Sequence, residues 1–301
     1  MEHREHVEGA VEVSVPATSA NLGPGFDALG IALDLRDTVR AEVADSLLID
    51  VEGQGADGVP RDERHLVYRA MVAAFARMGR PVPPVRLHCT NRIPHGRGLG
   101  SSSAAIVAGV VAARALVPGG ALLLDDVAVL DLAADLEGHA DNVAPALLGG
   151  LTVAFRTEAG YAATRLAVDP RIAAVLMVPE HEVATRTARG LLPDVVPHAD
   201  AAANAGRAAL LVAALTGRPE LLMPATEDWL HQEYRRDAFP ETLALVARLR
   251  AVGIPATVSG AGPSVLALVD AEERPDLAGE TPDGWAMWPL AVDPDGARLV
   301  C

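Results

Sequence analysis

Apolar and polar residues alternate over residues 11–15 ("VEVSV"), which is the pattern of a half-buried strand. The same two-residue period recurs over residues 85–89. Two further segments indicate strands, the continuous apolar run "IAAVLMV" at 172–178 and "GGLTVAF" at 149–155. Residues 256–270 predict a strand, a glycine turn and a second strand. Both halves of the chain should therefore contribute to sheet structure.

Longer apolar segments of helical composition predict helices over residues 101–116, 125 or 126 to 137, 199–215 and 241–252. Serines can cap the start of the first helix, and Gly138 can end the second. Strands and helices alternate without a strict βαβ rhythm. We therefore predict an α+β fold in two domains, residues 1–157 and 158–301, with the border near Arg156 to Gly160.

The amino-acid composition excludes several classes of function. Half of the 301 residues are apolar, enough for a sizeable core. The sequence contains no lysine, so all 25 basic residues are arginine, against 40 acidic ones. This excludes Schiff-base chemistry on lysine and a phosphate loop that uses lysine. A net charge of −15 disfavours nucleic acid and anionic membranes as partners.

The start of the chain, "MEHREHVEGA", lacks the apolar stretch of a signal peptide. The longest apolar run is roughly ten residues, about half a membrane span. We therefore expect a cytoplasmic protein. The only two cysteines, Cys89 and Cys301, form neither a disulfide framework nor a metal quartet.

One glycine-rich stretch, "PHGRGLGSSSAA" at residues 94–105, joins a predicted strand to a predicted helix. Glycines let backbone N–H groups approach phosphate oxygens, and a helix N-terminus adds about half a positive charge. A serine hydroxyl there could reach a Mg²⁺ ion that bridges phosphates. A tight strand-to-helix turn that binds no ligand can have the same local sequence, so the loop alone does not establish a phosphate site.

Three other stretches combine glycines with small polar residues: "PATSANLGPGFDALGIAL" (16–33), "GHADNVAPALLGG" (138–150) and "SGAGPSVLAL" (259–268). With the loop, they resemble the GHMP kinases, the superfamily that acts on galactose, homoserine, mevalonate and phosphomevalonate. "SANLGPGFD" and "HADNVAPA" are most similar to the homoserine kinases among them. The resemblance covers about residues 11–269.

This resemblance implies an N-terminal domain like ribosomal protein S5 domain 2 and a ferredoxin-like C-terminal domain. It implies ATP-dependent phosphorylation of the side-chain hydroxyl of L-homoserine, with ATP and Mg²⁺ as cofactors. The same fold acting on mevalonate or a sugar, and a non-catalytic nucleotide-binding protein, are the alternatives. The sequence leaves open whether the protein forms a homodimer. The stretch His65-Leu66-Val67-Tyr68 departs from the family's usual Asn-Leu-Val, which leaves the adenine contacts open.

For the nucleotide, the resemblance implies that the loop binds the phosphates through Pro94, Gly96, Arg97, Gly98, Leu99, Gly100, Ser101, Ser102 and Ser103. The resemblance also implies that Ser102 is a metal ligand. An acidic residue on the following helix would complete the Mg²⁺ site, and Asp135 is its counterpart. Glu137, about 200° away round a regular helix, and Asp131, on the same face as Asp135, are alternatives.

For the substrate, the resemblance places Asn21 near the accepting hydroxyl and Asp27 near the amino group. The amino-acid pocket, the carboxylate site and the closing glycine turn would use His139, Asp141, Thr185, Arg189, Arg235, Gly260 and Gly262. Arg236 is the alternative to Arg235. Asn21, Asp141 and Ser102 would form the catalytic set. Asp141 could act as a base, although anchoring the substrate's ammonium group explains it equally well.

Overall fold

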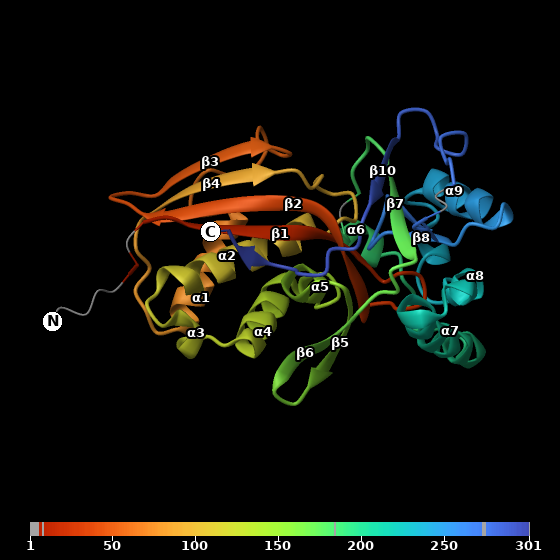
Figure 1. Cartoon of the computed structure of the whole chain (residues 1–301), viewed down its shortest axis with the longest axis horizontal. Helices are drawn as coiled ribbons and strands as arrows, with labels where there is room; N and C mark the ends of the chain where they lie inside the picture. Colours follow the sequence, from red (N-terminus) through yellow and green to blue (C-terminus); the bar gives the residue numbers. More distant parts are fainter. Residues whose placement is uncertain (1–5, 8, 184, 273–274, 301) are drawn as a thin grey trace.

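The computed structural model describes residues 6, 7, 9–183, 185–272 and 275–300, except for the side chains of Thr185 and Arg186. Its larger sheet has the order β11-β1-β2-β4-β3, and the hairpin β5–β6 is attached to β2 (Figure 1). The strands are β1 (Val11–Ala20), β2 (Leu29–Val43), β3 (Leu48–Gly53), β4 (Val85–Asn91), β5 (Leu151–Thr157), β6 (Gly160–Leu166) and β11 (Arg298–Leu299).

Helices cover one face of this sheet (Figure 1). They are α1 (Leu66–Arg77), α2 (Ser101–Leu116), α3 (Gly120–Leu123), α4 (Asp126–Glu137) and α5 (Val143–Leu148). The alanine-rich helix α2 is buried along most of its length. Gly109 lets α1 approach closely, because a Cβ atom there would lie 2.4 Å from the carbonyl oxygen of Val67.

The smaller sheet has the order β10-β7-β9-β8 and consists of β7 (Ile172–Val178), β8 (Ala256–Val258), β9 (Val265–Asp270) and β10 (Ala286–Leu290). Both faces of β7 are buried. Val175 and Met177 pack with α9 (Pro240–Ala251), whereas Leu176 belongs to the main core together with Leu211 and Leu215 of α7 (His198–Gly217).

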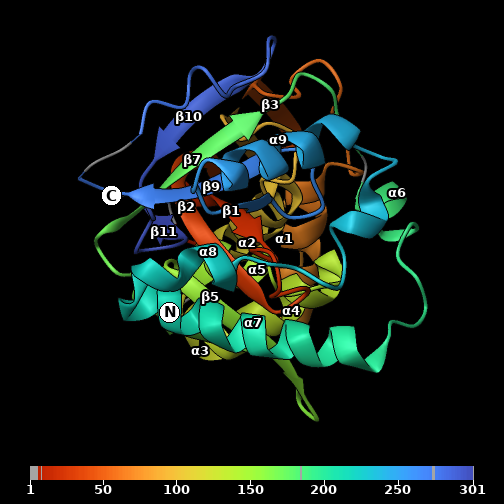
Figure 2. The same ribbon diagram turned by 90° about the vertical axis from the view of Figure 1, so that its right-hand side faces the viewer.

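The remaining elements are α6 (Thr185–Arg189), η1 (Pro219–Leu221), α8 (Leu222–Ala225) and η2 (Glu233–Arg235). Figure 2 views the molecule from the end at which α7, α8 and α9 lie, with α1 and α2 behind them. Among the described residues, no helix combines the length and apolar character that crossing a membrane requires.

The α+β fold class is confirmed, as are the predicted strands and helices, with shifts of a few residues at their ends. The predicted domain border between residues 157 and 158 falls in the turn between β5 and β6. Both of these strands belong to the larger sheet, to which β11 also returns through pairing of Leu299 with Val13. The border itself stays a prediction.

Candidate functional site

The glycine-rich loop runs from β4 into α2 with a left-handed backbone at Gly96, Gly98 and Gly100, whose φ angles are 66°, 72° and 69°. A Cβ atom on Gly98 would lie 2.2 Å from the carbonyl oxygen of Ser259, and one on Gly100 would lie 1.9 Å from Thr18 Oγ1. Gly100 is the N-cap of α2, and no side chain caps this helix. Its first N–H groups are therefore available to an anion.

A cavity of about 220 Å³ lies at this helix start and brings together residues from both halves of the chain. It is lined by Asn21, Gly96, Gly98, Leu99, Gly100, Ser101, Ser102, Glu137, His139, Asp141, Asn142, Arg189, Arg235, Gly260 and Ala261. Most of the residues that the sequence nominated therefore meet in one place.

The acidic partner of the loop is Glu137. Its Oε1 atom accepts hydrogen bonds from Ser102 Oγ at 2.5 Å and from Ser103 Oγ at 2.9 Å. The structure favours Glu137 over Asp135 as the metal ligand, because Asp135 is exposed and lies outside the cavity lining. The end of α4 turns the face of Glu137 toward α2, which leaves Asp135 on the solvent side. Asp131 instead accepts a bond from the backbone N–H of Tyr161.

The donor set at this point suits Mg²⁺, which prefers hard oxygen ligands from one or two side chains together with phosphate oxygens. Ser102 and Glu137 supply such oxygens. Over the described residues, there is no group of three or more His, Cys, Asp or Glu side chains that could hold a metal ion unaided.

His139 and Asp141 form a bonded pair beside Glu137. The Nδ1 atom of His139 lies 2.6 Å from Asp141 Oδ1, and Nε2 lies 4.0 Å from Glu137 Oε1. Burial disfavours the imidazolium, but the hydrogen bond and negative charge of Asp141, helped by Glu137, outweigh it and raise the pKa of His139. Asp141 is itself buried.

Asn21 bridges two loops. Its φ angle is 67°, its Nδ2 atom donates to the carbonyl oxygen of Gly260 at 2.8 Å, and its Oδ1 atom accepts from the N–H of Asp27 at 2.9 Å. The Asn21 side chain is thereby fixed at the cavity wall.

Arg189 and Asp27 contact each other directly. The Nη2 and Nη1 atoms of Arg189 donate to the two carboxylate oxygens of Asp27, at 2.6 and 3.1 Å. Thr185 begins α6, and its side chain lies outside the described residues.

Arg235 is 1% exposed and lines the cavity, whereas Arg236 forms an exposed ion pair with Glu233. The structure thus favours Arg235 of the two candidates. Burial, reinforced by the charge of Arg189, lowers the pKa of Arg235 to about 10, so it remains protonated at neutral pH. Within the described part of the chain, its Nη2 atom is buried and has no hydrogen-bond partner.

Arg97 does not face the cavity. Its guanidinium group donates to the carbonyl oxygens of His95, Pro179 and Glu180 and to the carboxylate of Glu182. This arrangement does not favour phosphate binding by Arg97, because its donors hold the loop against the segment after β7. Pro94 is buried outside the cavity lining, and Ser103 points at Glu137.

A second cavity of about 250 Å³ shares Ser101 and Ser102 with the first. Its wall includes the stretch His65 to Val67, and the Nδ1 atom of His65 is buried without a hydrogen-bond partner in the described structure. The sequence did not point to Asp37, which also lines this cavity and accepts bonds from the backbone N–H groups of Arg92 and Ile93. The one feature that could have pointed to Asp37 is its carboxylate at an inward-facing position of β2.

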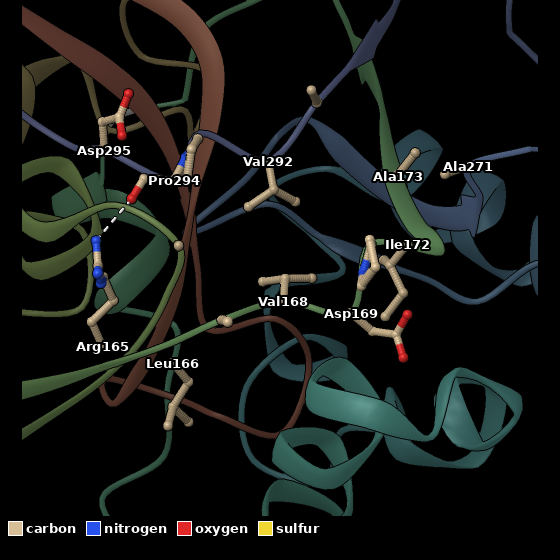
Figure 3. Close-up of a pocket in the computed structure, with 14 residues that line it drawn as sticks. Arg165, Leu166, Val168, Asp169, Ile172, Ala173, Ala271, Val292, Pro294 and Asp295 are labelled. Carbon is tan, nitrogen blue, oxygen red and sulfur yellow. Dashed lines mark hydrogen bonds between the residues drawn. The ribbon is translucent and has the colours of Figure 1, made fainter.

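A larger cavity of about 630 Å³ lies elsewhere at the junction of the two sheets (Figure 3). Val168 and Val292 line its centre, and Arg165 at one side donates to the carbonyl oxygen of Pro294 at 3.0 Å. None of the residues nominated from the sequence lines it. Chemistry rather than size therefore identifies the candidate site.

Comparison with known proteins supports this choice. The family model for the GHMP kinases N terminal domain matches residues 65–150, and that for GHMP kinases C terminal matches residues 210–281. A homoserine kinase of Streptomyces avermitilis is 58% identical over 292 residues, which cover 97% of this chain and 96% of the relative. A homoserine kinase of Clavibacter michiganensis subsp. michiganensis is 50% identical, with 96% and 93% covered.

Among solved structures, homoserine kinase from Cytophaga hutchinsonii matches with a TM-score of 0.83 at 27% identity and covers 100% of both chains. Mevalonate diphosphate decarboxylase from Enterococcus faecalis shares the fold, with a TM-score of 0.65 at 14% identity over 97% of this chain and 98% of that one. Because identity to homoserine kinases extends over nearly the whole chain and both halves match the family models, the chain belongs to the GHMP kinases and, within them, to the homoserine kinases.

Proposed function

We propose that the chain transfers the γ-phosphoryl group of ATP to the side-chain hydroxyl of L-homoserine in the cavity between the glycine-rich loop and Arg235. The observation that carries the proposal is the composition of this one cavity. Phosphate-binding backbone, two arginines and a carboxylate–histidine pair line the same space of about 220 Å³. A kinase for a small zwitterionic alcohol requires these groups within reach of one another.

The N–H groups of the loop and of the first turn of α2 would bind the phosphates. The neighbouring cavity would hold the nucleoside, since both cavities meet at Ser101 and Ser102. Its apolar wall of Ala105, Ala108 and Val67 suits a base, and the unpartnered nitrogen of His65 offers it a hydrogen bond. Neither role requires lysine.

Ser102 and Glu137 would hold Mg²⁺ with their oxygens. When bound, the ion neutralises charge on the phosphate oxygens. The 2.5 Å bond between Ser102 Oγ and Glu137 Oε1 already brings both side chains to one point. Ser103 fixes the same carboxylate from the buried side.

The substrate would lie across the cavity with its charged end away from the loop. Arg235, one of whose buried nitrogens has no partner in the described structure, and Arg189 would bind the α-carboxylate. Asp27 and Asp141 are the carboxylates available to the ammonium group. Asn21 would then direct the hydroxyl toward the γ-phosphate, where transfer needs alignment and charge stabilisation more than a dedicated base.

The competing functions differ in the charges of the substrate. Mevalonate carries a carboxylate but no ammonium group, and galactose carries neither. The cavity offers both signs of charge, which favours a zwitterion. A non-catalytic nucleotide-binding protein would have no use for a buried guanidinium nitrogen beside the phosphate loop that has no partner among the described residues.

The test is Mg²⁺-dependent release of ADP from ATP, measured with L-homoserine, L-serine, mevalonate and galactose side by side. We expect turnover with homoserine well above the other three. Equal turnover with mevalonate or galactose would reject the substrate assignment, and nucleotide binding without ADP release from any alcohol would support the non-catalytic alternative.

A cytoplasmic location, a homodimer and the lack of a nucleic-acid partner stay predictions. The last rests on the net charge of −15. Light scattering on the purified protein tests the homodimer.

A further inference from the structure

A buried histidine holds the guanidinium group of Arg235. The Nη1 atom of Arg235 lies 2.9 Å from Nδ1 of His231, and its Nε atom donates to the carbonyl oxygen of Ala188 at 3.1 Å. His231 also stacks on Phe26, with ring centroids 5.2 Å apart, and the Arg235 guanidinium lies 5.6 Å from the same ring. These contacts leave Nη2 as the nitrogen without a partner in the described structure.

The partners of His231 determine its protonation state. A guanidinium group can only donate hydrogen bonds, so Nδ1 must be an acceptor. The other ring nitrogen, Nε2, lies 2.8 Å from the carbonyl oxygen of Gly23, which can only accept. His231 is therefore the neutral tautomer with its proton on Nε2, and burial lowers its pKa in the same direction.

Asp228 is the nearest carboxylate, but its oxygens are already used. Oδ1 accepts from the N–H of Leu230, and Oδ2 accepts from the N–H groups of His231 and Gln232. The distance of 3.6 Å from Oδ1 to Nε2 of His231 exceeds that of a hydrogen bond. The ring thus has two polar partners, Arg235 and Gly23.

The Gly23 end of this connection belongs to the loop that carries Asn21 and Asp27. Asn21, Leu22 and Gly23 all have left-handed φ angles, of 67°, 51° and 84°. The loop is also held by Asn204, whose Nδ2 atom donates to the carbonyl oxygen of Pro24 at 2.7 Å. His231 therefore links the proposed carboxylate site directly to the loop that presents the groups for the hydroxyl and the ammonium.

We propose that His231 is a positioning residue that fixes the guanidinium of Arg235 relative to the Asn21 loop and thereby sets the span between the carboxylate and the hydroxyl of the substrate. The inference rests on the proposed function, because it assigns the two ends of that span to homoserine. It predicts that His231 governs binding of the carboxylate specifically, and that it contributes to the choice of a four-carbon over a three-carbon amino acid.

Two substitutions separate the two hydrogen bonds. The terminal atoms of asparagine are as many bonds from Cα as Nδ1 of histidine, and those of glutamine are as many as Nε2. His231→Asn therefore keeps an acceptor for Arg235 and loses the bond to Gly23, whereas His231→Gln keeps a donor to Gly23 and loses the bond to Arg235.

With His231→Gln, we expect the KM for homoserine to rise by roughly 10- to 100-fold, the effect of losing one hydrogen bond to a charged group. For 3-aminopropan-1-ol, which lacks the carboxylate, kcat/KM should change by less than about threefold, because this alcohol makes no use of the Arg235 bond. With His231→Asn, the preference for homoserine over serine should fall while the KM for homoserine changes less. His88→Gln, the same change on an exposed side chain of β4, should alter none of these constants.

An equal loss on both alcohols in His231→Gln would overturn the proposal, since it would indicate general damage to the fold. The wild-type protein gives an independent measurement, as ¹⁵N spectroscopy of the imidazole should report a neutral ring with its proton on Nε2. A proton on Nδ1 would reject the link to Arg235 whatever the variants do. If the wild-type protein fails to phosphorylate homoserine, the proposed function falls, and the tautomer measurement still decides the hydrogen-bond arrangement.

Discussion

Arg189 and Asp27 are joined by a two-point ion pair across 162 residues of sequence, with bonds of 2.6 and 3.1 Å between guanidinium and carboxylate. We propose that both side chains bind the same substrate, Arg189 at its carboxylate and Asp27 at its ammonium group. The two roles compete, because a guanidinium engaged edge-on with Asp27 offers fewer donors to a second carboxylate. A zwitterion can replace both halves of the pair at once, whereas a substrate with a single charge leaves one partner uncompensated.

This relationship predicts the effect of Asp27→Asn on substrate choice. The change removes the carboxylate that would bind the ammonium and releases Arg189 from its partner. We expect kcat/KM for homoserine to fall by about tenfold or more, and the ratio of 4-hydroxybutanoate to homoserine turnover to rise. Steady-state kinetics with both alcohols measure this ratio, and an unchanged ratio would contradict the exchange of ion pairs.

The two arginines should differ in the size of their effect. Arg235 is buried, and removing one partner of a buried ion pair costs about 3–5 kcal/mol, so Arg235→Leu should raise the KM for homoserine by at least about a hundredfold. The Arg189 side chain is 33% exposed and already paired with Asp27, so Arg189→Leu should raise it less. The KM for ATP should change by less than about threefold in both variants.

Arg236→Leu is the matched control, because Arg236 is the neighbour of Arg235 and forms an exposed pair with Glu233. Its KM for homoserine should remain that of the wild type. A larger effect from Arg236 than from Arg235 would reverse the assignment.

The metal site is tested by a pair of acids on one helix. Glu137→Gln should sharply raise the Mg²⁺ concentration needed for half-maximal activity, because it replaces the carboxylate that receives Ser102 and Ser103 by a neutral amide. Asp135→Asn should leave this requirement unchanged, since Asp135 is exposed on the other side of α4. The two variants are compared by measuring activity as a function of Mg²⁺ concentration at saturating ATP. A shift for Asp135→Asn alone would restore the original assignment.

Local signals explain which elements the sequence could predict. Helix α4 begins where Asp125 accepts a bond from the N–H of Ala128 and ends where Gly138 takes a φ angle of 92°. The long strand β2 was missed, because residues 29–33 are buried on both sides and show no alternation. Helix α1 was missed as well. Its N-cap, His65, makes no side-chain capping bond, so the segment carries no start signal.

The residues of the candidate site also divide into those that a local sequence pattern identifies and those that it does not. The glycine-rich loop is a local pattern and could be located from the sequence. The choice between Asp135 and Glu137 depends on which face of α4 packs against α2, and all partners of Arg97 except His95 come from residues 179–182, far away in the chain. Arg235 and Arg236 are adjacent in sequence, and the path of the backbone through η2 buries one and exposes the other. None of these choices has a signal within a few residues.

The loop geometry predicts the result of Gly100→Ala. The new Cβ atom would lie 1.9 Å from Thr18 Oγ1, which donates to Asn142 Oδ1, so either the Thr18 side chain or the start of α2 must shift. We expect the KM for ATP to rise by at least about tenfold, and stability to fall by roughly 1–3 kcal/mol from the left-handed backbone alone. Gly79→Ala is the control, because Gly79 has a φ angle of 65° and no atom of the described residues would lie within 4 Å of its Cβ. The Gly79→Ala variant should lose similar stability and keep the ATP kinetics of the wild type. If the two variants have equal ATP kinetics, the assignment of the loop to the nucleotide site is wrong.

Asp37 gives a prediction about stability and pH. Its carboxylate is buried at the second cavity, and burial raises its pKa from 3.8 to about 6, although the N–H groups of Arg92 and Ile93 donate to it and act in the opposite direction. Below about pH 4, the group is protonated in both the folded and the unfolded chain and has no effect. Between about pH 4 and pH 6, the unfolded chain has lost the proton and the folded chain retains it, so unfolding releases a proton and the folded state loses stability as the pH rises.

Above about pH 6, this loss is complete, and a pKa difference of roughly two units corresponds to about 3 kcal/mol. Asp37→Asn keeps an oxygen that can accept from both N–H groups but carries no charge at any of these pH values. The free energy of unfolding of the variant minus that of the wild type should therefore rise by about 3 kcal/mol between about pH 4 and pH 7. Urea unfolding of both proteins across this range measures the difference, in which the titration of groups far from Asp37 cancels. A difference that stays constant with pH would mean that Asp37 is solvated well enough to ionise normally, and a falling one would mean that the two N–H donors dominate over burial.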